Sequence, residues 1–422
     1  MSKLLSIRSP QRSPIATASV ALTLLVSGCS CGPTMASIDG RPTDAGPFFG
    51  GIDAPGYEPT DSGPRPPEPC AVPVRRVRFP VGDGSLGHTN SLWASGSRAW
   101  VYLGGYSGPG SPPPSLHLFD LEGERELDID FVLGEDDLVL RVFEAPTGFE
   151  LLVLRSGGDG PHLVFTDRDG RLTGASEEEL AGGPHVRLDD GRYVGMPEVG
   201  AVTSPVAAAL EIAAPGARVE RIDLGFETMN GHWAALHWTG ETLVGVGYED
   251  ETASVLRFEV DLETAEVRLA TLVEGVRPSG LLGRVIALWS SADTATVALT
   301  YEPGDAPAGS PQIAELFWWP IGGDTVTRHT VRPAADLSVG VLALGGAMPR
   351  QTLVLAQTSS SRTWVTAARV RAPGDVVGGT EPIGVFTGIT DAAAWEPSAG
   401  TAALALLAQR ELEVLYVCEG AP

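Results

Sequence analysis

The chain has 422 residues, of which 43% are hydrophobic and 19% charged, so it can form two or three average domains or one large β array. Its 53 acidic residues outnumber 29 basic residues and give a net charge of −24. This charge argues against a nucleic-acid interface and against electrostatic docking on anionic lipid, because both require a basic face.

The N-terminus has the pattern of an export signal. Lys3, Arg8 and Arg12 form a positive segment without acidic residues. Residues 15–26 then form an apolar run that is too short to span a bilayer as a mature helix. The segment therefore predicts transport out of the cytoplasm.

The apolar run ends in Val26-Ser27-Gly28-Cys29, which resembles the lipobox of bacterial lipoproteins. The resemblance implies a signal peptide over residues 1–28, lipidation of Cys29 and attachment to a membrane through that lipid. Ser30 follows the cysteine in place of the aspartate that retains some lipoproteins in the inner membrane, so the resemblance implies the outer membrane. An ordinary signal peptide is the alternative.

Residues 29–69 are predicted to be a tether behind the lipidated cysteine. The segment is rich in proline and glycine, and such sequences are extended and form no core. Asp39, Asp44, Asp53 and Asp61 could be read as calcium ligands, but their irregular spacing fits no calcium-binding loop.

From residue 70 onwards the chain reads as one strand after another, with turn residues between apolar runs. The same unit returns about every 50 residues, a period typical of propeller-like arrays. It consists of an apolar strand, a turn of small residues and a second apolar strand. Its anchor residues are Trp93, Phe143, Leu188, Trp238, Trp289, Leu344 and Trp395.

The repeat predicts an all-β fold over residues 70–422, a seven-bladed propeller of four-stranded antiparallel blades. The last blade, at residues 389–418, has only three strands of its own, so the strand at residues 72–79 is predicted to complete it and close the ring. The six complete blades are expected to begin near residues 88, 136, 184, 228, 277 and 336.

Two of the predicted blades resemble kelch repeats. In the first, Val101-Tyr102-Leu103 runs into Gly104-Gly105, and Leu118-Phe119-Asp120 follows. In that family a double glycine ends the second strand, and an apolar residue, an aromatic residue and an aspartate occupy the third strand. Leu152-Val153-Leu154 before Gly157-Gly158 is a looser match, and the other blades lack the double glycine.

The sequence contains no nucleophile elbow, phosphate loop or dinucleotide fingerprint, and no cofactor is expected. His232 and His237 are five residues apart, which places them on opposite faces of a strand and argues against a shared metal. Trp93, Trp238, Trp289 and Trp395 occupy the same place in the repeat. They are therefore predicted to pack between blades, with a sugar-binding surface as the alternative.

A candidate ligand-binding face follows from the propeller analogy. The loops that enter each blade and those that join its second and third strands gather on one face of such a ring. Aromatic, amide and arginine side chains there would suit a polar ligand or a peptide. The predicted residues of this face are His88, Asn90, Tyr106, Asn230, His232, Tyr248, Arg277 and Tyr301.

A disulfide is predicted between Cys70 and Cys418, because an exported protein reaches an oxidising compartment. If the strand at residues 72–79 pairs antiparallel with the strand at residues 412–417, the two cysteines lie side by side. Cys31 lies beside the lipid anchor and is left over.

These features predict a lipid-anchored propeller of the cell envelope that binds or scaffolds a protein or glycan partner and no nucleic acid. A propeller enzyme that hydrolyses or cleaves carbohydrate is the first alternative, and a structural envelope protein is the second. The fold alone does not choose between them.

The Cys29→Ser substitution should abolish lipidation, because the thiol is the group that accepts the lipid in the lipoproteins that the leader resembles. The protein should then appear in the soluble fraction or keep its leader. Labelling cells with a radioactive fatty acid measures this, and equal incorporation into wild type and variant would refute the assignment.

Overall fold

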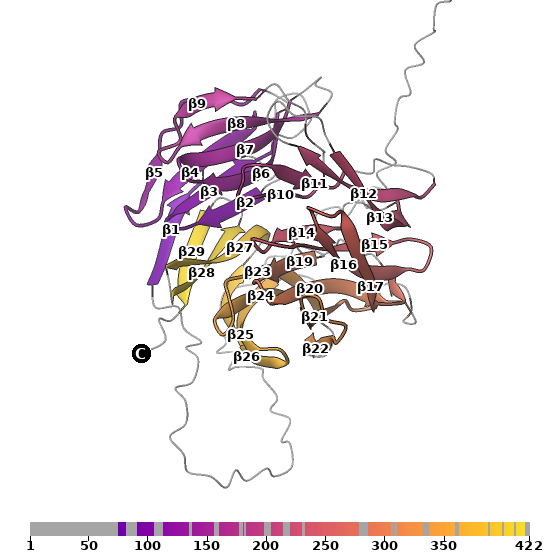
Figure 1. The fold of residues 1–422 in the computed structure, drawn as a ribbon. Helices are drawn as coiled ribbons and strands as arrows, with labels where there is room; N and C mark the ends of the chain where they lie inside the picture. The colour runs from indigo at the N-terminus through magenta and orange to yellow at the C-terminus, as the bar shows by residue number, and fades with distance from the viewer. Residues whose placement is uncertain are drawn as a thin grey trace, which may run out of the picture. The chain divides into compact units, whose positions relative to one another are not determined.

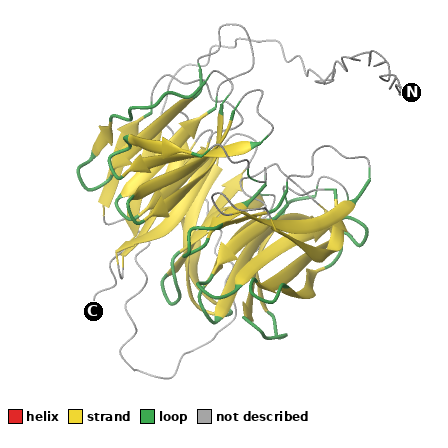
Figure 2. Cartoon of the chain, turned by 45° about the horizontal axis from the view of Figure 1, so that its top comes forward, coloured by secondary structure: helices red, strands yellow, loops and turns green. Residues whose placement is uncertain are grey.

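The fold was analysed in a computed structural model that describes most of the chain from Arg75 onwards. All regular structure in the described part is β-strand (Figure 2). The described residues are 75–81, 91–104, 113–134, 137–155, 160–176, 180, 183–197, 204–213, 220–229, 233–277, 286–304, 307, 310–331, 337–358, 363–386, 389–398, 401–408 and 411–417.

The strands form seven antiparallel sheets, and each sheet is one blade of a propeller (Figure 1). This confirms the predicted seven-bladed, four-stranded, all-β architecture, and the blades begin close to the predicted positions. Blade 1 consists of β2 (Ser91–Ser95), β3 (Arg98–Leu103), β4 (Ser115–Asp120) and β5 (Arg125–Leu127), and blade 2 of β6 (Leu138–Ala145), β7 (Gly148–Leu154), β8 (Pro161–Asp167) and β9 (Leu172–Ala175). Blade 3 consists of β10 (His185–Arg187), β11 (Tyr193–Gly195), β12 (Val206–Ala213) and β13 (Glu220–Thr228), and blade 4 of β14 (Ala235–Trp238), β15 (Leu243–Glu249), β16 (Ser254–Asp261) and β17 (Glu266–Val273).

Blade 5 differs from the others because it has a short additional strand, β18, which pairs with the end of β20. Blade 7 contains the last three strands of the chain, and β1 pairs antiparallel with β29. Blade 5 consists of β18 (Val276–Arg277), β19 (Ile286–Ser290), β20 (Thr294–Pro303), β21 (Ile313–Pro320) and β22 (Thr327–Val331). Blade 6 consists of β23 (Ser338–Gly345), β24 (Gln351–Thr358), β25 (Thr363–Ala372) and β26 (Asp375–Phe386). The sheet of blade 7 contains β27 (Ile389–Ser398), β28 (Thr401–Ala408), β29 (Glu411–Val417) and β1 (Arg75–Pro80).

The first strands of the blades form the inner ring. β2, β6, β10, β14, β19, β23 and β27 contact one another in this order, and β27 returns to β2. A middle strand such as β15 is covered by a neighbouring blade on each face, so all of its side chains except the last are buried. The outer strand β13 alternates buried and exposed residues along much of its length, as expected when one face is in water.

Adjacent blades are joined by buried polar groups in addition to their apolar contacts. The Glu150 carboxylate of blade 2 accepts hydrogen bonds from Arg187 Nε and the Tyr193 hydroxyl of blade 3, both at 2.5 Å. The Glu259 carboxylate of blade 4 accepts one from Trp319 Nε1 of blade 5 at 3.1 Å. Because a buried carboxylate is costly unless it is hydrogen-bonded, these pairs specify which blade surfaces fit together.

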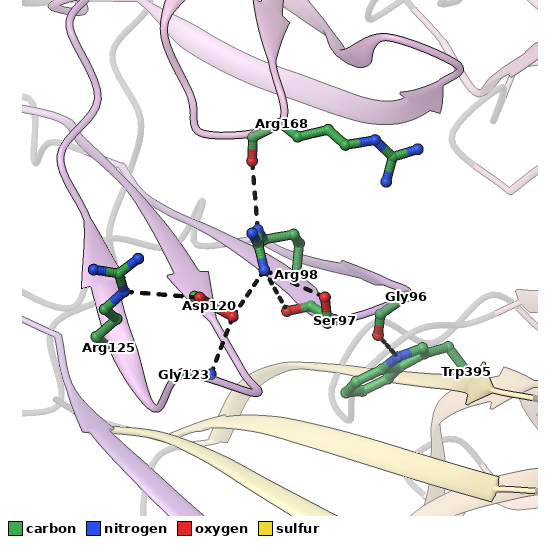
Figure 3. A network of polar contacts seen from close by, with 8 residues as sticks. All are labelled: Gly96, Ser97, Arg98, Asp120, Gly123, Arg125, Arg168 and Trp395. Atoms are coloured by element: carbon green, nitrogen blue, oxygen red, sulfur yellow. Dashed lines mark hydrogen bonds and ion pairs between the residues drawn. The ribbon is translucent and has the colours of Figure 1, made fainter.

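Blades 7 and 1 are the last and first blades in the chain, and two hydrogen bonds join them. The backbone N–H of Leu92 donates to Asp391 Oδ2 at 2.8 Å. Trp395 Nε1 donates to the carbonyl of Gly96 at 2.9 Å (Figure 3). Gly96 lies in the turn between β2 and β3 with a φ of 54°, a conformation that favours glycine.

The same turn of blade 1 also reaches blade 2. Arg98 Nη1 binds Asp120 Oδ1 at 2.8 Å, and Arg98 Nε donates to the carbonyl of Arg168 (Figure 3). Asp120 also accepts from the backbone N–H of Gly123. Asp120 therefore holds a β-turn and an inter-blade arginine in place.

The N-terminal strand β1 contributes to the same region. Its residues Val77 and Phe79 are buried in a cluster that also contains residues of blades 1 and 7. The Phe79 ring lies 4.9 Å from the Phe119 ring of blade 1. Closure of the ring by this strand stays a prediction that these contacts favour.

The Phe79→Ala substitution should lower the free energy of unfolding by about 3–5 kcal/mol, because it removes a buried ring between blades 7 and 1. Arg78→Lys is the matched control, since Arg78 is exposed on the same strand and lysine keeps the positive charge beside the buried Glu413. Chemical denaturation of both variants measures the difference. Equal stability of Phe79→Ala and wild type would show that β1 is not an integral strand.

Candidate functional site

A cavity of about 730 Å³ is enclosed by the inner ring, and the first strand of every blade or residues next to it contribute to its lining. Because these strands are spread over the whole propeller sequence, the cavity depends on the ring. Its aromatic and ionisable side chains are Trp93, Trp100, Phe149, Trp289, Trp395, Arg141, Glu144, His185, His237 and Glu396.

The repeated tryptophans belong partly to this cavity and partly to the blade interfaces. Trp395 is buried, whereas Trp93, Trp238 and Trp289 are only partly buried. Trp93, Trp289 and Trp395 line the cavity, and Trp238 Nε1 donates to Asp189 of blade 3 at 3.1 Å. The prediction of inter-blade packing therefore holds for Trp395 and Trp238. Trp93 also packs against a cluster from blades 1 and 2, and the Trp289 ring contacts His237 of blade 4, while both rings offer further surface to the cavity.

Two charged side chains of opposite sign enter the cavity from β6. Arg141 and Glu144 are both exposed within an otherwise mostly buried or half-buried strand. Glu144 accepts a hydrogen bond from the Ser95 hydroxyl and forms an ion pair with Arg168 Nη1 at 3.5 Å. Its charge is thus matched by a neighbour outside the cavity.

His237 lies on β14 and is held by β19. Its Nδ1 is 2.7 Å from the Ser290 hydroxyl, and its ring centroid is 5.9 Å from that of Trp289. Burial, together with the positive charge of Arg141, lowers the pKa of His237 from 6.5 to about 4. The imidazole is therefore neutral at pH 7 and can accept or donate a hydrogen bond.

His185 and Trp100 form further parts of the cavity wall. A Cβ atom at Gly195 would lie 2.5 Å from His185 Nε2, so the glycine leaves the space that the imidazole fills. The indole of Trp100 is 1% exposed and packs edge-on against Phe149 at 5.5 Å. Within the described residues its Nε1 has no hydrogen-bond partner.

Most of the sequence-predicted ligand face cannot be compared with this cavity. His88, Asn90, Tyr106, Asn230 and His232 lie outside the described residues, so their part in a ligand face stays a prediction. The same holds for lipidation of Cys29 and for a disulfide between Cys70 and Cys418.

Tyr248 and Arg277 are described, and both have structural partners. Tyr248 is 5% exposed, packs against Trp233 at 5.4 Å and donates to the carbonyl of Val276 at 3.3 Å. Burial raises the pKa of this tyrosine. Arg277 Nη2 donates to the carbonyl of Pro303 at 3.0 Å. Tyr248 is therefore a core residue, which corrects its assignment to an exposed loop face. The place of Arg277 on that face stays a prediction.

Tyr301 is also a core residue, at 3% exposure, and it belongs to a buried polar network in blade 5. Its hydroxyl donates to the buried Glu315 carboxylate, which also binds Arg328 Nη2 at 2.7 Å and the Thr330 hydroxyl at 2.6 Å. Burial and then the bond to Glu315 raise the pKa of Tyr301. The network lies against a second cavity, of about 1110 Å³, beside the end of β17.

The described residues contain no cluster of histidine, cysteine, aspartate and glutamate suited to a metal ion. They also contain no helix long and apolar enough to cross a bilayer.

Five residues line the cavity but are absent from the sequence-predicted ligand face: Arg141, Glu144, His185, His237 and Glu396. The sequence contained a signal for Arg141 and Glu144, because these charged residues interrupt the otherwise apolar β6, which is the innermost strand of its blade. No comparable signal marks His185, which stands in a three-residue strand.

The free energy of unfolding should decrease as the pH falls from 6.5 towards 4, because His237 binds a proton in the unfolded chain but not in the folded chain. The expected loss is about 2–3 kcal/mol between pH 7.5 and pH 4.5. In His237→Gln this part of the pH dependence should disappear, whereas His162→Gln, on the third strand of blade 2, serves as control. Urea unfolding at both pH values measures it, and identical pH dependence in wild type and His237→Gln would contradict the assignment.

Comparisons with known proteins show likeness of fold. No protein-family model matches the chain, and no curated protein matches it. Kuenenia stuttgartiensis hydrazine synthase is 12% identical with a TM-score of 0.55, covering 80% of this chain and 97% of that chain. The polysaccharide lyase Uly1 is 9% identical (TM-score 0.48; 80% and 91% covered), and the β-propeller domain of Myceliophteria thermophila Cps50 (Swd1) is 13% identical (TM-score 0.48; 81% and 100% covered). At these identities the likeness concerns the propeller fold alone.

Proposed function

We propose that this protein is a lipid-anchored module of the bacterial cell envelope that binds a glycan in the central cavity of its propeller. The observation that carries the proposal is the combination of side chains in that cavity. Trp93 and Trp289 offer partly exposed indole rings, and Arg141, Glu144 and His237 stand among them.

This combination suits a sugar chemically. The C–H face of a pyranose ring can pack on an indole, which presents a large apolar surface. The hydroxyl groups around the ring need donors and acceptors, and Arg141 donates, Glu144 accepts and neutral His237 can do either.

Binding is favoured over cleavage by what Glu144, one of the two carboxylates of the cavity, contacts. Hydrolysis of a glycosidic bond normally uses two carboxyl groups, one of them poised to donate a proton. Glu144 is already engaged by the Ser95 hydroxyl and by Arg168, so it is suited to accept hydrogen bonds and not to donate a proton. An enzyme acting on carbohydrate and a structural envelope protein are the alternatives.

The leader and the tether support the proposed location. A lipidated Cys29 would hold the protein at a membrane, and residues 30–69 would separate the propeller from it. A stable lipid anchor needs more than one acyl chain, as in bacterial lipoproteins. A propeller on such a tether could reach glycans of the envelope.

Isothermal titration calorimetry of the full chain tests binding, with chitohexaose, cellohexaose and soluble peptidoglycan fragments as the probes. At least one of these probes should bind. Trp289→Ala should weaken its binding about tenfold, which corresponds to about 1.4 kcal/mol, because it removes one of the indole surfaces on which a sugar ring can pack. Trp364→Ala is the matched control, since Trp364 lies on the third strand of blade 6 and does not line the cavity.

The alternatives give different results in the same experiment. Shortened oligosaccharides after incubation would identify an enzyme. Absence of binding to every probe, or equal weakening by Trp289→Ala and Trp364→Ala, would refute glycan binding in the central cavity.

A further inference from the structure

Three polar side chains on blade 1 form a hydrogen-bonded chain outside the central cavity. The Ser115 hydroxyl lies 3.0 Å from His117 Nε2, and His117 Nδ1 lies 2.7 Å from Glu126 Oε1. Ser115 and His117 are two residues apart on β4 and therefore share a face of the sheet. Glu126 is on the adjacent strand β5, where it pairs with Phe119.

The carboxylate decides which nitrogen of His117 carries the proton. An ionised Glu126 can only accept hydrogen bonds, so Nδ1 must donate to it. Nε2 is then the acceptor in the neutral imidazole, and the Ser115 hydroxyl donates to it. This is the order of groups that activates a serine nucleophile: hydroxyl, imidazole, carboxylate.

Packing orients the imidazole as well. The His117 ring stacks on the Phe119 ring, with centroids 6.2 Å apart and an angle of 14° between the planes. Phe119 is 1% exposed and is itself held by Phe79 at 4.9 Å. The base is therefore positioned from two sides, by a carboxylate and by a buried ring.

We propose that Ser115, His117 and Glu126 form a second site on this propeller, one that transfers an acyl group from a small carboxylic ester through Ser115. Ser115 and His117 are the catalytic residues, and Glu126 is a positioning residue. The site is separate from the central cavity and does not depend on the proposed glycan binding.

The first half-reaction forms an acyl-serine. His117 Nε2 takes the proton of the Ser115 hydroxyl while Oγ forms a bond to the ester carbonyl carbon, and the carbonyl π electrons move onto oxygen. The tetrahedral adduct then breaks its bond to the alkoxy oxygen, which takes the proton back from His117. One alcohol leaves and one acylated Ser115 remains.

The second half-reaction returns the free serine. A water molecule gives a proton to His117 Nε2 and attacks the acyl carbon. The bond to Ser115 Oγ breaks, Ser115 recovers a proton from His117, and the carboxylic acid leaves. The sum is ester hydrolysis, with no oxidant or reductant.

Exposure and location define the substrate class. Ser115 is half-buried, and the His117 and Glu126 side chains are 16% and 49% exposed. The three described cavities do not include Ser115, and a small acyl group such as acetyl needs no such pocket. Ser115 pairs with Leu103 at the end of β3. It therefore lies at the end of blade 1 where β2 begins and β3 ends.

The test uses the full chain with a biotinylated fluorophosphonate, in which Oγ displaces fluoride from phosphorus, and with p-nitrophenyl acetate. Peptide mass spectrometry should locate the phosphonyl group on Ser115. Ser115→Ala should lose the label and the esterase activity. His117→Ala should lower the labelling rate at least 100-fold, because a positioned general base contributes about 10²–10⁴-fold. His162→Ala, on the third strand of blade 2, should label like wild type.

The role of Glu126 needs a readout that a structural effect would not change. The labelling rate of wild type should rise with pH and then level off, as expected for a reaction that uses a general base. In Glu126→Gln the rate should fall about tenfold and the midpoint of this curve should move, while Glu126→Asp should restore much of the rate. Thermal unfolding of each variant checks that it is folded.

The outcomes separate clearly. A wild-type protein whose Ser115 stays unlabelled while a known serine esterase is fully labelled in parallel overturns the proposal. Equal labelling of wild type and His117→Ala also overturns it, because the imidazole would then not be the base. Either result leaves glycan binding in the central cavity unaffected.

Discussion

The whole structure depends on burial of both faces of each blade against its two neighbours. A four-stranded sheet with an apolar middle strand such as β15 cannot leave either face in water, and the ring is the arrangement in which every blade finds two partners. Burial of apolar surface supplies most of the stabilisation, while Glu150 and Glu259 give the interfaces their register. Each of these carboxylates would be costly if the facing blade shifted, since its donors belong to that blade.

The ring also creates the candidate binding site. Since the first strand of every blade faces the axis, residues as distant in the chain as Trp93, His237 and Trp395 line one cavity. The inner strands can carry charges such as Arg141 because they face this cavity and not a neighbouring blade. The same geometry explains the low pKa of His237, which is buried beside a positive charge contributed by another blade.

The second proposed site has a different origin. Ser115, His117 and Glu126 meet through local strand pairing within blade 1, so they need only two neighbouring strands. Their alignment still depends on packing outside these two strands, since Phe119 contacts both His117 and Phe79 of the N-terminal strand. A sequence motif could not reveal them, because the spacing between Ser115 and Glu126 depends on the length of the turn between β4 and β5.

The sequence by itself determined the all-β class, the number of blades and their approximate boundaries, because a repeated pattern of apolar strands and turns has few other solutions. It did not determine the site. Tyr248 and Tyr301 end apolar strands and were assigned to a loop face, yet both are buried, because the neighbouring structure covers them. Only the tertiary structure decided which residues line the central cavity, since the lining brings together residues from the first strands of seven blades that are far apart in the sequence.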